Sequence, residues 1–133
     1  MDPAVNADVL RVAPAGAPRF FSDDVDEVRA YMDGHTGAHW RRALGTRPLG
    51  FDMAVLGSGR ARVAWFRCAG DQAVRGSVPD ATLQLAFGGE ATYRVGRRDV
   101  AVAPRNAMLL MPGSDVTIVT RDIHRFLLAV PWK

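Results

Sequence analysis

The stretch Ala81–Met111, ATLQLAFGGEATYRVGRRDVAVAPRNAMLLM, decides the fold class. Apolar and polar side chains alternate along Leu83–Phe87 and again around Tyr93, which is the period of a β-strand with one buried face. Gly88-Gly89 and Gly96-Arg97 interrupt this pattern and are typical of two-residue hairpin turns. Similar alternating runs lie on either side, near residues 62–66 and 116–120. About eight or nine short strands are therefore expected, in an all-β sandwich or barrel.

One run within this stretch does not alternate. Met108–Met111 is apolar at every position, and Phe126–Val130 is similar. Such runs predict strands that are covered on both faces.

A single helix is expected on the N-terminal side of the strands. Asp24 is a suitable N-cap, and Glu27 follows three positions later, as in a capping box. Gly34 predicts the end of the helix after about ten residues. Its apolar face consists of four residues at helical spacing, Val25, Val28, Tyr31 and Met32.

The segment before the helix has a different composition. Residues 1–19 are rich in Ala, Pro and Val and show no sustained period, which predicts an N-terminal arm that is flexible unless docked. A short strand near residues 8–12 is one option within it. The folded domain is expected over residues 20–133.

The composition is that of an ordinary globular domain, with 133 residues, 48% hydrophobic and 23% charged. The net charge is +3, and the arginines are scattered instead of forming the basic stripe of a nucleic-acid-binding surface. The single cysteine, Cys68, excludes an intrachain disulfide and fits a reducing compartment. No secretory signal and no apolar run of membrane-spanning length is visible, so we expect a cytoplasmic protein.

Several catalytic signatures are missing from the sequence. Gly45 and Gly50 have the spacing of a Walker A motif but are not followed by its lysine. No serine lies in a G-x-S-x-G motif, and one cysteine excludes a CxxC motif. His35 and His39 are four residues apart and are one possible start of a zinc site, but the nearby glycines disfavour a continuous helix, and His124 is the only other histidine. We therefore expect no catalytic residue, metal or cofactor.

Motifs at both ends of the domain resemble the N-terminal domain of AraC-type transcriptional regulators. The first is Phe21–Tyr31, FSDDVDEVRAY, and the second is Gly96–Pro104, GRRDVAVAP, followed by Ala107–Gly113, AMLLMPG. The resemblance extends over residues 20 to 131. It implies a cupin-like double-stranded β-helix, a jelly-roll barrel preceded by an arm and a helix. It also implies a small-molecule effector and a homodimer.

The resemblance also sets limits on function. In such regulators a separate domain with two helix-turn-helix units binds DNA, and this chain ends without one, so we expect no DNA contact by this fragment alone and no membrane contact. Metal-dependent cupins carry an HxH pair, which this sequence lacks. That departure favours a sensor over an enzyme. The alternatives are a stand-alone cupin-like enzyme and a ligand-free protein-interaction module.

Strand alternation predicts which side chains face the barrel interior, where a small ligand fits. The candidate ligand-binding residues are Trp65, Arg67, Gln84, Tyr93, Met108, Leu110, His124 and Phe126. Gln84 stands out because a buried amide needs hydrogen-bond partners. If Arg67 or Arg94 points inward, the effector is expected to be an organic or aromatic acid, since a buried guanidinium needs a counter-charge.

Several of these candidates have an ordinary alternative. Trp65, Met108 and Phe126 are also typical of a plain apolar core, His124 of a satisfied or half-exposed strand position, and Arg67 of a side chain that points to solvent. The apolar helix face, the candidate dimerisation surface, either covers the barrel or contacts a second copy.

Overall fold

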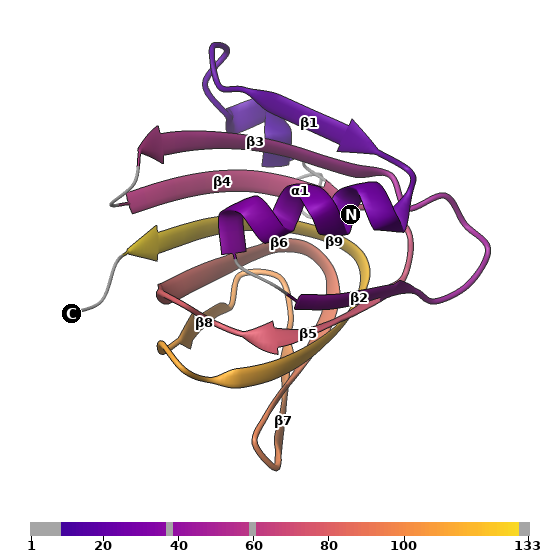
Figure 1. Ribbon diagram of the computed structural model, residues 1–133, viewed down its shortest axis with the longest axis vertical. Coiled ribbons are helices and arrows are strands. Elements are labelled where there is room, and N and C mark those ends of the chain that lie inside the picture. Colours follow the sequence, from indigo (N-terminus) through magenta and orange to yellow (C-terminus); the bar gives the residue numbers. More distant parts are fainter. Residues whose placement is uncertain (1–8, 37–38, 59–60, 131–133) are drawn as a thin grey trace.

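The computed structural model describes residues 9–36, 39–58 and 61–130, which form nine strands, one α-helix and one 3-10 helix (Figure 1). The helices are η2 (Val9–Val12) and α1 (Val25–Thr36). The strands are β1 (Arg19–Ser22), β2 (His39–Ala43), β3 (Phe51–Ser58), β4 (Ala61–Cys68), β5 (Gln72–Ser77), β6 (Ala81–Val95), β7 (Arg98–Val102), β8 (Ala107–Leu110) and β9 (Asp115–Val130). The predicted mainly β fold is confirmed.

The strands form one antiparallel sheet that curls into a half-barrel (Figure 1). Its order is β1-β3-β4-β9-β5-β2, and β6 pairs with β9 on one side and with β7 and β8 on the other. The long strand β9 pairs with β5 through residues 115–120 and with β4 through residues 123–129. Figure 1 shows α1 lying across this sheet, between β4 and β2.

The predicted hairpin turn at Gly88-Gly89 is wrong. Strand β6 continues through these glycines without a turn, and its pairing with β9 shifts register on both sides of Gly88. Gly89 has a φ of +75°, and a Cβ there would overlap the carbonyl oxygen of Asp122. Two glycines thus permit a β-bulge at which two long strands bend together. The turn at Gly96-Arg97 is confirmed, since these residues alone separate β6 from β7.

The start of α1 was predicted correctly. Asp24 Oδ1 accepts the N–H of Asp26 at 2.8 Å, which satisfies a free donor of the first turn. The hydroxyl of Ser22 donates to Glu27 Oε1 at 2.6 Å and accepts the N–H of Asp24 at 3.0 Å. The predicted end at Gly34 is wrong, because the helix continues to Thr36.

The apolar face of α1 packs against the protein's own core. Val28 is fully buried and Met32 is buried, while Val25 and Tyr31 pack partly buried against the same cluster. Tyr31 also stacks on Phe20 of β1, with ring centroids 3.9 Å apart. The dimerisation surface proposed for these four helix residues is therefore corrected: the helix covers its own barrel.

The N-terminal segment is docked from Val9 onward. Residues 9–12 form η2 instead of the strand considered for residues 8–12, and residues 1–8 lie outside the described residues. Val9 and Leu10 are buried against Ala54 of β3 and Trp65 of β4. The arm thus covers part of the outer side of the sheet.

Another part of the outer side is apolar and uncovered in the described chain. Leu83 lies opposite both Leu109 and Leu128, and Leu85 lies opposite Phe126. Directly opposed residues project from the same side of a sheet, so these five side chains form one surface, which we call the outer apolar face. Leu109 is 60% exposed. The expectation that residues 108–111 are covered on both faces is therefore wrong.

Candidate functional site

The interior of the half-barrel contains a cavity of about 150 Å³. A cavity of about this size accommodates a single benzene ring in other proteins. Its mouth carries the half-exposed ion pair between Arg62 and Asp80, at 3.7 Å. The apolar part of the lining includes Met32, Phe51, Phe66, Val74, Leu110, Ile118 and Leu127.

Arg41 brings a buried positive charge to this cavity. Its neighbours along β2 alternate, so that His39 and Arg41 face inward while Trp40 is exposed. Arg41 is 9% exposed, donates from Nη1 to Gln72 Oε1 at 2.5 Å, and lies 5.7 Å from the centroid of the Phe51 ring. Burial lowers the pKa of its guanidinium to about 10. Within the described ranges, no carboxylate lies within ion-pair distance of it.

His39 connects Arg41 to the helix. Its Nε2 accepts a hydrogen bond from Arg41 Nε at 3.2 Å, and its Nδ1 lies 2.9 Å from Asp33 Oδ1 on α1. An imidazole that accepts at Nε2 and donates at Nδ1 is neutral, so this arrangement assigns the proton to Nδ1. Asp33, His39 and Arg41 thus form a continuous polar chain from α1 to the cavity.

A second polar group, formed by Gln84 and Tyr93, lies in the cavity wall on β6. The Tyr93 hydroxyl donates to Gln84 Oε1, which is the partner that a buried amide at position 84 requires. Burial raises the pKa of Tyr93, an effect that the positive charge of Arg125 opposes. Arg125 is 1% exposed and donates from Nη1 to the carbonyl oxygens of Gly88 and His124, both at 3.3 Å.

The structure divides the predicted interior residues into two groups. Gln84, Tyr93 and Leu110 line the cavity. Met108 packs against the hydrophobic core but does not line the cavity. The remaining four are on the outer side of the sheet, where the placement predicted for them is corrected. These are Trp65, Arg67, His124 and Phe126.

The reason for this reversal is the N-terminal arm. Trp65 lies opposite Phe126 across β4 and β9, with ring centroids 5.5 Å apart, and Trp65 packs beneath η2. Because the arm buries part of the outer side, large aromatic residues occupy both faces of β4. Phe66, the next residue, lines the cavity instead.

The two arginines considered as inward cations are both paired elsewhere. Arg67 lies 3.5 Å from Asp52, and Arg94 binds Asp99 at 2.7 Å on the surface. Arg41 and Arg125 take the interior positions, and sequence reasoning missed both. For Arg125 a signal existed, because it alternates in step with the apolar residues Ile123 and Leu127.

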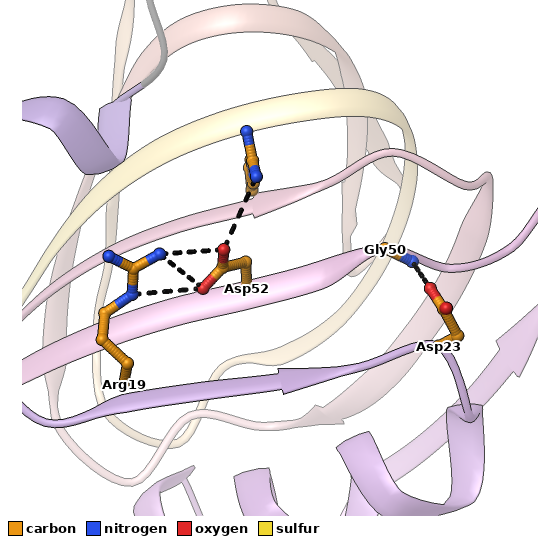
Figure 2. A network of polar contacts seen from close by, with 5 residues as sticks. Arg19, Asp23, Gly50 and Asp52 are labelled. Carbon is orange, nitrogen blue, oxygen red and sulfur yellow. Dashed lines mark hydrogen bonds and ion pairs between the residues drawn. The ribbon is translucent and has the colours of Figure 1, made fainter.

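A polar network holds the N-terminal elements against the barrel (Figure 2). Asp52 of β3, 7% exposed, accepts hydrogen bonds from Arg19 of β1, with Nη2 at 2.9 Å from both carboxylate oxygens. Asp23, just before α1, accepts the N–H of Gly50 at 2.9 Å. These contacts fix β1 and the start of α1 relative to β3.

The described residues contain no group of three metal-ligating side chains arranged to hold an ion. His35 and His39, the pair considered for zinc, both lie at the cavity but make other contacts. Burial and the charge of Arg62 lower the pKa of His35, and His39 binds Arg41 and Asp33. None of the described helices is both long and apolar enough to cross a bilayer.

The fold and the site define a class of protein: a cupin-like β-barrel domain whose internal cavity is lined by apolar side chains and a few buried polar ones. The sequence pattern of the AraC-binding-like domain family matches residues 28–131, and the chain belongs to that family. No curated protein matches it in sequence.

Solved structures agree with this fold. The AraC-like transcriptional activator CuxR superposes with a TM-score of 0.70 at 17% identity, over 86% of this chain and 47% of CuxR. This chain thus spans about half the length of CuxR. An RmlC-like cupin from Shewanella frigidimarina gives a TM-score of 0.53 at 11% identity, over 71% of this chain and 85% of that protein. A cupin superfamily protein from Desulfitobacterium hafniense gives 0.51 at 16% identity, over 74% and 81% respectively.

Proposed function

We propose that this chain is the ligand-sensing and dimerisation domain of an AraC-type transcription regulator, and that it binds a small organic acid inside the barrel. Membership of the AraC-binding-like family supports the regulatory role. The acid is inferred from a single observation, the buried guanidinium of Arg41 at the cavity. DNA binding belongs to a separate domain in this proposal, and a reducing cytoplasm suits the single buried thiol of Cys68.

The chemistry of Arg41 favours a carboxylate. A guanidinium removed from water loses strong hydration and is stabilised when an anion forms two parallel hydrogen bonds with it. Gln72 and His39 use Nη1 and Nε, and Nη2 has no hydrogen bond to any described residue. Arg41 therefore has a nitrogen available for an acid that enters the cavity.

The shape and lining of the cavity favour an aromatic body for this acid. A volume of about 150 Å³ suits one ring, and the walls provide Phe51, Phe66 and aliphatic side chains. Flat aromatic rings pack well against such walls. We therefore propose an aromatic carboxylate, held by Arg41 at its acidic end.

Differential scanning fluorimetry tests this proposal, since a ligand that binds only the native state raises its melting temperature. The probes are benzoate and salicylate, with benzamide and salicylamide as neutral isosteres. We expect the acids to stabilise the wild type, and Arg41→Gln to abolish the effect. Arg42→Gln is the matched control, because Arg42 is exposed on the same strand and stacks over Trp40. Equal stabilisation by acids and amides, or retention of the effect in Arg41→Gln, would contradict the proposal.

Dimerisation is proposed through the outer apolar face. Its five residues carry no charge, so the face offers nothing that selects a charged partner. A two-fold axis places the same patch on both sides, and apolar side chains then meet apolar side chains. A second copy of this chain is therefore the proposed occupant.

Light scattering after size-exclusion chromatography tests this part. We expect a dimer for the wild type and a monomer for Leu109→Asp, since Leu109 is 60% exposed and its loss leaves the core intact. Val12→Asp is the control, because Val12 is 69% exposed but lies on η2. A wild-type monomer at micromolar concentration would refute dimerisation by this domain.

Metal analysis separates the sensor from a cupin enzyme. Cupin chemistry uses a metal bound by several imidazoles. Stoichiometric iron, zinc or manganese in the purified protein would overturn the proposal that this domain is not an enzyme.

A further inference from the structure

Gln84 has a hydrogen-bond donor that faces the cavity and has no partner in the described chain. Its Oε1 accepts the hydroxyl proton of Tyr93, whereas its Nε2 makes no hydrogen bond to any described residue. That nitrogen is not among the described polar atoms that are fully enclosed without a partner, so it retains accessible surface. Since Gln84 is 8% exposed and lines the cavity, this surface faces the cavity. A largely buried amide donor is stabilised when it finds an acceptor.

The sheet around Gln84 offers no side-chain acceptor. Gln84 lies opposite Met108 of β8 on one side and opposite Leu127 of β9 on the other. Neither side chain carries an oxygen, and Leu127 lines the same cavity. The acceptor for Gln84 Nε2 is therefore expected to come from a molecule that occupies the cavity.

The bulge in β6 brings Gln84 and Tyr93 together. The two residues are nine positions apart on one strand, which in a straight strand would separate them by about 30 Å. The bulge at Gly88-Gly89 lies between them and bends the strand, so that their side chains meet. Arg125 donates to the carbonyl of Gly88, and its charge acts on the Tyr93 hydroxyl. A cation near the hydroxyl attracts the oxygen lone pairs, which favours the orientation in which the proton points to Gln84 Oε1.

The strand register relates this pair to Arg41. A single row of opposed residues crosses four strands, from β2 through β5 and β9 to β6, and it consists of Arg41, Val74, Ile118 and Tyr93. All four line the cavity. Three strand spacings amount to about 14 Å along the wall, and the separation across a curled sheet is shorter. A ligand along this wall would meet the guanidinium at one end, apolar side chains in the middle, and Gln84 at the other end.

We propose that Gln84 determines specificity, and that the effector is an aromatic acid with an uncharged oxygen acceptor on the part of the ring away from the carboxylate. Arg41 binds the carboxylate, and Gln84 Nε2 donates to the second oxygen, which belongs to a carbonyl, hydroxyl or ether group. Tyr93 is a positioning residue, because it holds the amide with its nitrogen toward the cavity. This inference rests on the proposed function, since it requires that an aromatic acid binds in the barrel.

Isothermal titration of the wild-type chain tests the inference with 3- and 4-formylbenzoate. A formyl oxygen accepts hydrogen bonds and cannot donate them. The corresponding vinylbenzoates are the matched probes, because a vinyl group has nearly the same shape and no acceptor. We expect at least one formylbenzoate to bind about fivefold or more tightly than its vinyl counterpart, which corresponds to one hydrogen bond at a buried site.

Three variants assign this preference to the amide. In Gln84→Leu the ratio of the two affinities is expected to fall to about one. Tyr93→Phe should also lower the ratio, since the amide loses the donor that orients it, whereas a general loss of packing would weaken both ligands alike. Thr82→Val is the matched control, because Thr82 is buried and lines the cavity on the same strand, but its hydroxyl already donates to the Asp80 carbonyl at 3.1 Å.

The outcomes separate this inference from the proposed function. Equal binding of each formylbenzoate and its vinyl counterpart by the wild type would overturn the role of Gln84 and leave the acid sensor intact. Failure of all four acids to bind would overturn both. A preference that survives in Gln84→Leu, or that Thr82→Val abolishes as well, would overturn the assignment to Gln84. The wild-type preference supports the recognition of an acceptor even if a variant does not fold, and Tyr93→Phe then assigns it in place of Gln84→Leu.

Discussion

Replacement of Asp52 by asparagine tests whether the network beneath β1 stabilises the fold. The side chain of Asp52 is 10% exposed, and it binds Arg19 with Nε at 3.2 Å and Nη2 at 2.9 Å. Arg67 adds a further contact at 3.5 Å. The amide in Asp52→Asn would keep one acceptor oxygen but lose the charge that faces two arginines.

The expected loss follows from the exposure of the partners. Breaking a fully buried ion pair costs about 3–5 kcal/mol because one charge stays buried, whereas an exposed pair contributes about 0–1 kcal/mol. Here the side chains of Arg19 and Arg67 are 51% and 39% exposed, so water hydrates both after the substitution. We therefore expect Asp52→Asn to lower the free energy of unfolding by about 1–2 kcal/mol. For a domain of this size that corresponds to a fall of roughly 4–8 °C in melting temperature.

Thermal and urea unfolding followed by circular dichroism measure this loss. Asp99→Asn is the matched control, since Asp99 also binds an arginine through two hydrogen bonds, at 2.7 and 3.1 Å, but on the surface. We expect no measurable change for that variant. Equal losses in both variants would refute the argument from burial, as would an unchanged melting temperature for Asp52→Asn.

Three further predictions concern the fold. Gly89→Ala is expected to lower the free energy of unfolding in urea by about 3 kcal/mol or more, because the added Cβ overlaps the backbone of Asp122. Gly96→Ala should cost only about 1–2 kcal/mol, because its Cβ contacts no other atom and only the positive φ is unfavourable. Similar losses in the two variants would argue against the bulge. Burial raises the pKa of the Cys68 thiol to about 12, so a disulfide reagent at pH 8 should modify it only as fast as the protein unfolds. The thiol in the unfolded state loses its proton from about pH 9, whereas in the folded state it keeps the proton up to about pH 12. The free energy of unfolding should therefore fall as the pH rises from 9 toward 12, and Cys68→Ala should make this fall less steep. Val28→Ala should cost about 2 kcal/mol because Val28 is fully buried, and Val12→Ala, at 69% exposure, should cost almost nothing; equal values would contradict the packing of α1 on the barrel.

The elements that could be predicted from sequence depend on local interactions. The N-cap at Asp24 and the turn at Gly96-Arg97 involve residues within a few positions of each other, and both are confirmed. Strand alternation around Leu83–Phe87 is also local. These signals sufficed for a mainly β fold with one helix.

Gly88-Gly89 shows where local reasoning reaches its limit. The same dipeptide suits a tight turn and a β-bulge, because both need a residue with positive φ. The choice here depends on Asp122, which lies opposite in β9 and far away in sequence. Only the pairing of the two long strands distinguishes the alternatives.

Prediction of the candidate site also failed where it depends on contacts between residues far apart in sequence. Alternation shows that Trp65 and Phe66 face opposite sides of β4, but it does not show which side is the interior. That assignment depends on η2, more than fifty residues earlier, which covers Trp65. Arg41 and Arg125 were missed because an arginine in a strand is usually placed in solvent.

The position of α1 has a consequence for how this domain can change its ligand over evolution. Val28 supports the core and Met32 forms part of the cavity wall one turn later, so one helix serves both tasks. A smaller residue at position 32 would leave room for a larger ligand, but it would also destabilise the fold because packed atoms are removed from the interior. Variants with altered selectivity should therefore arise more readily at Val74 on β5, where the helix is not involved, than on α1 itself.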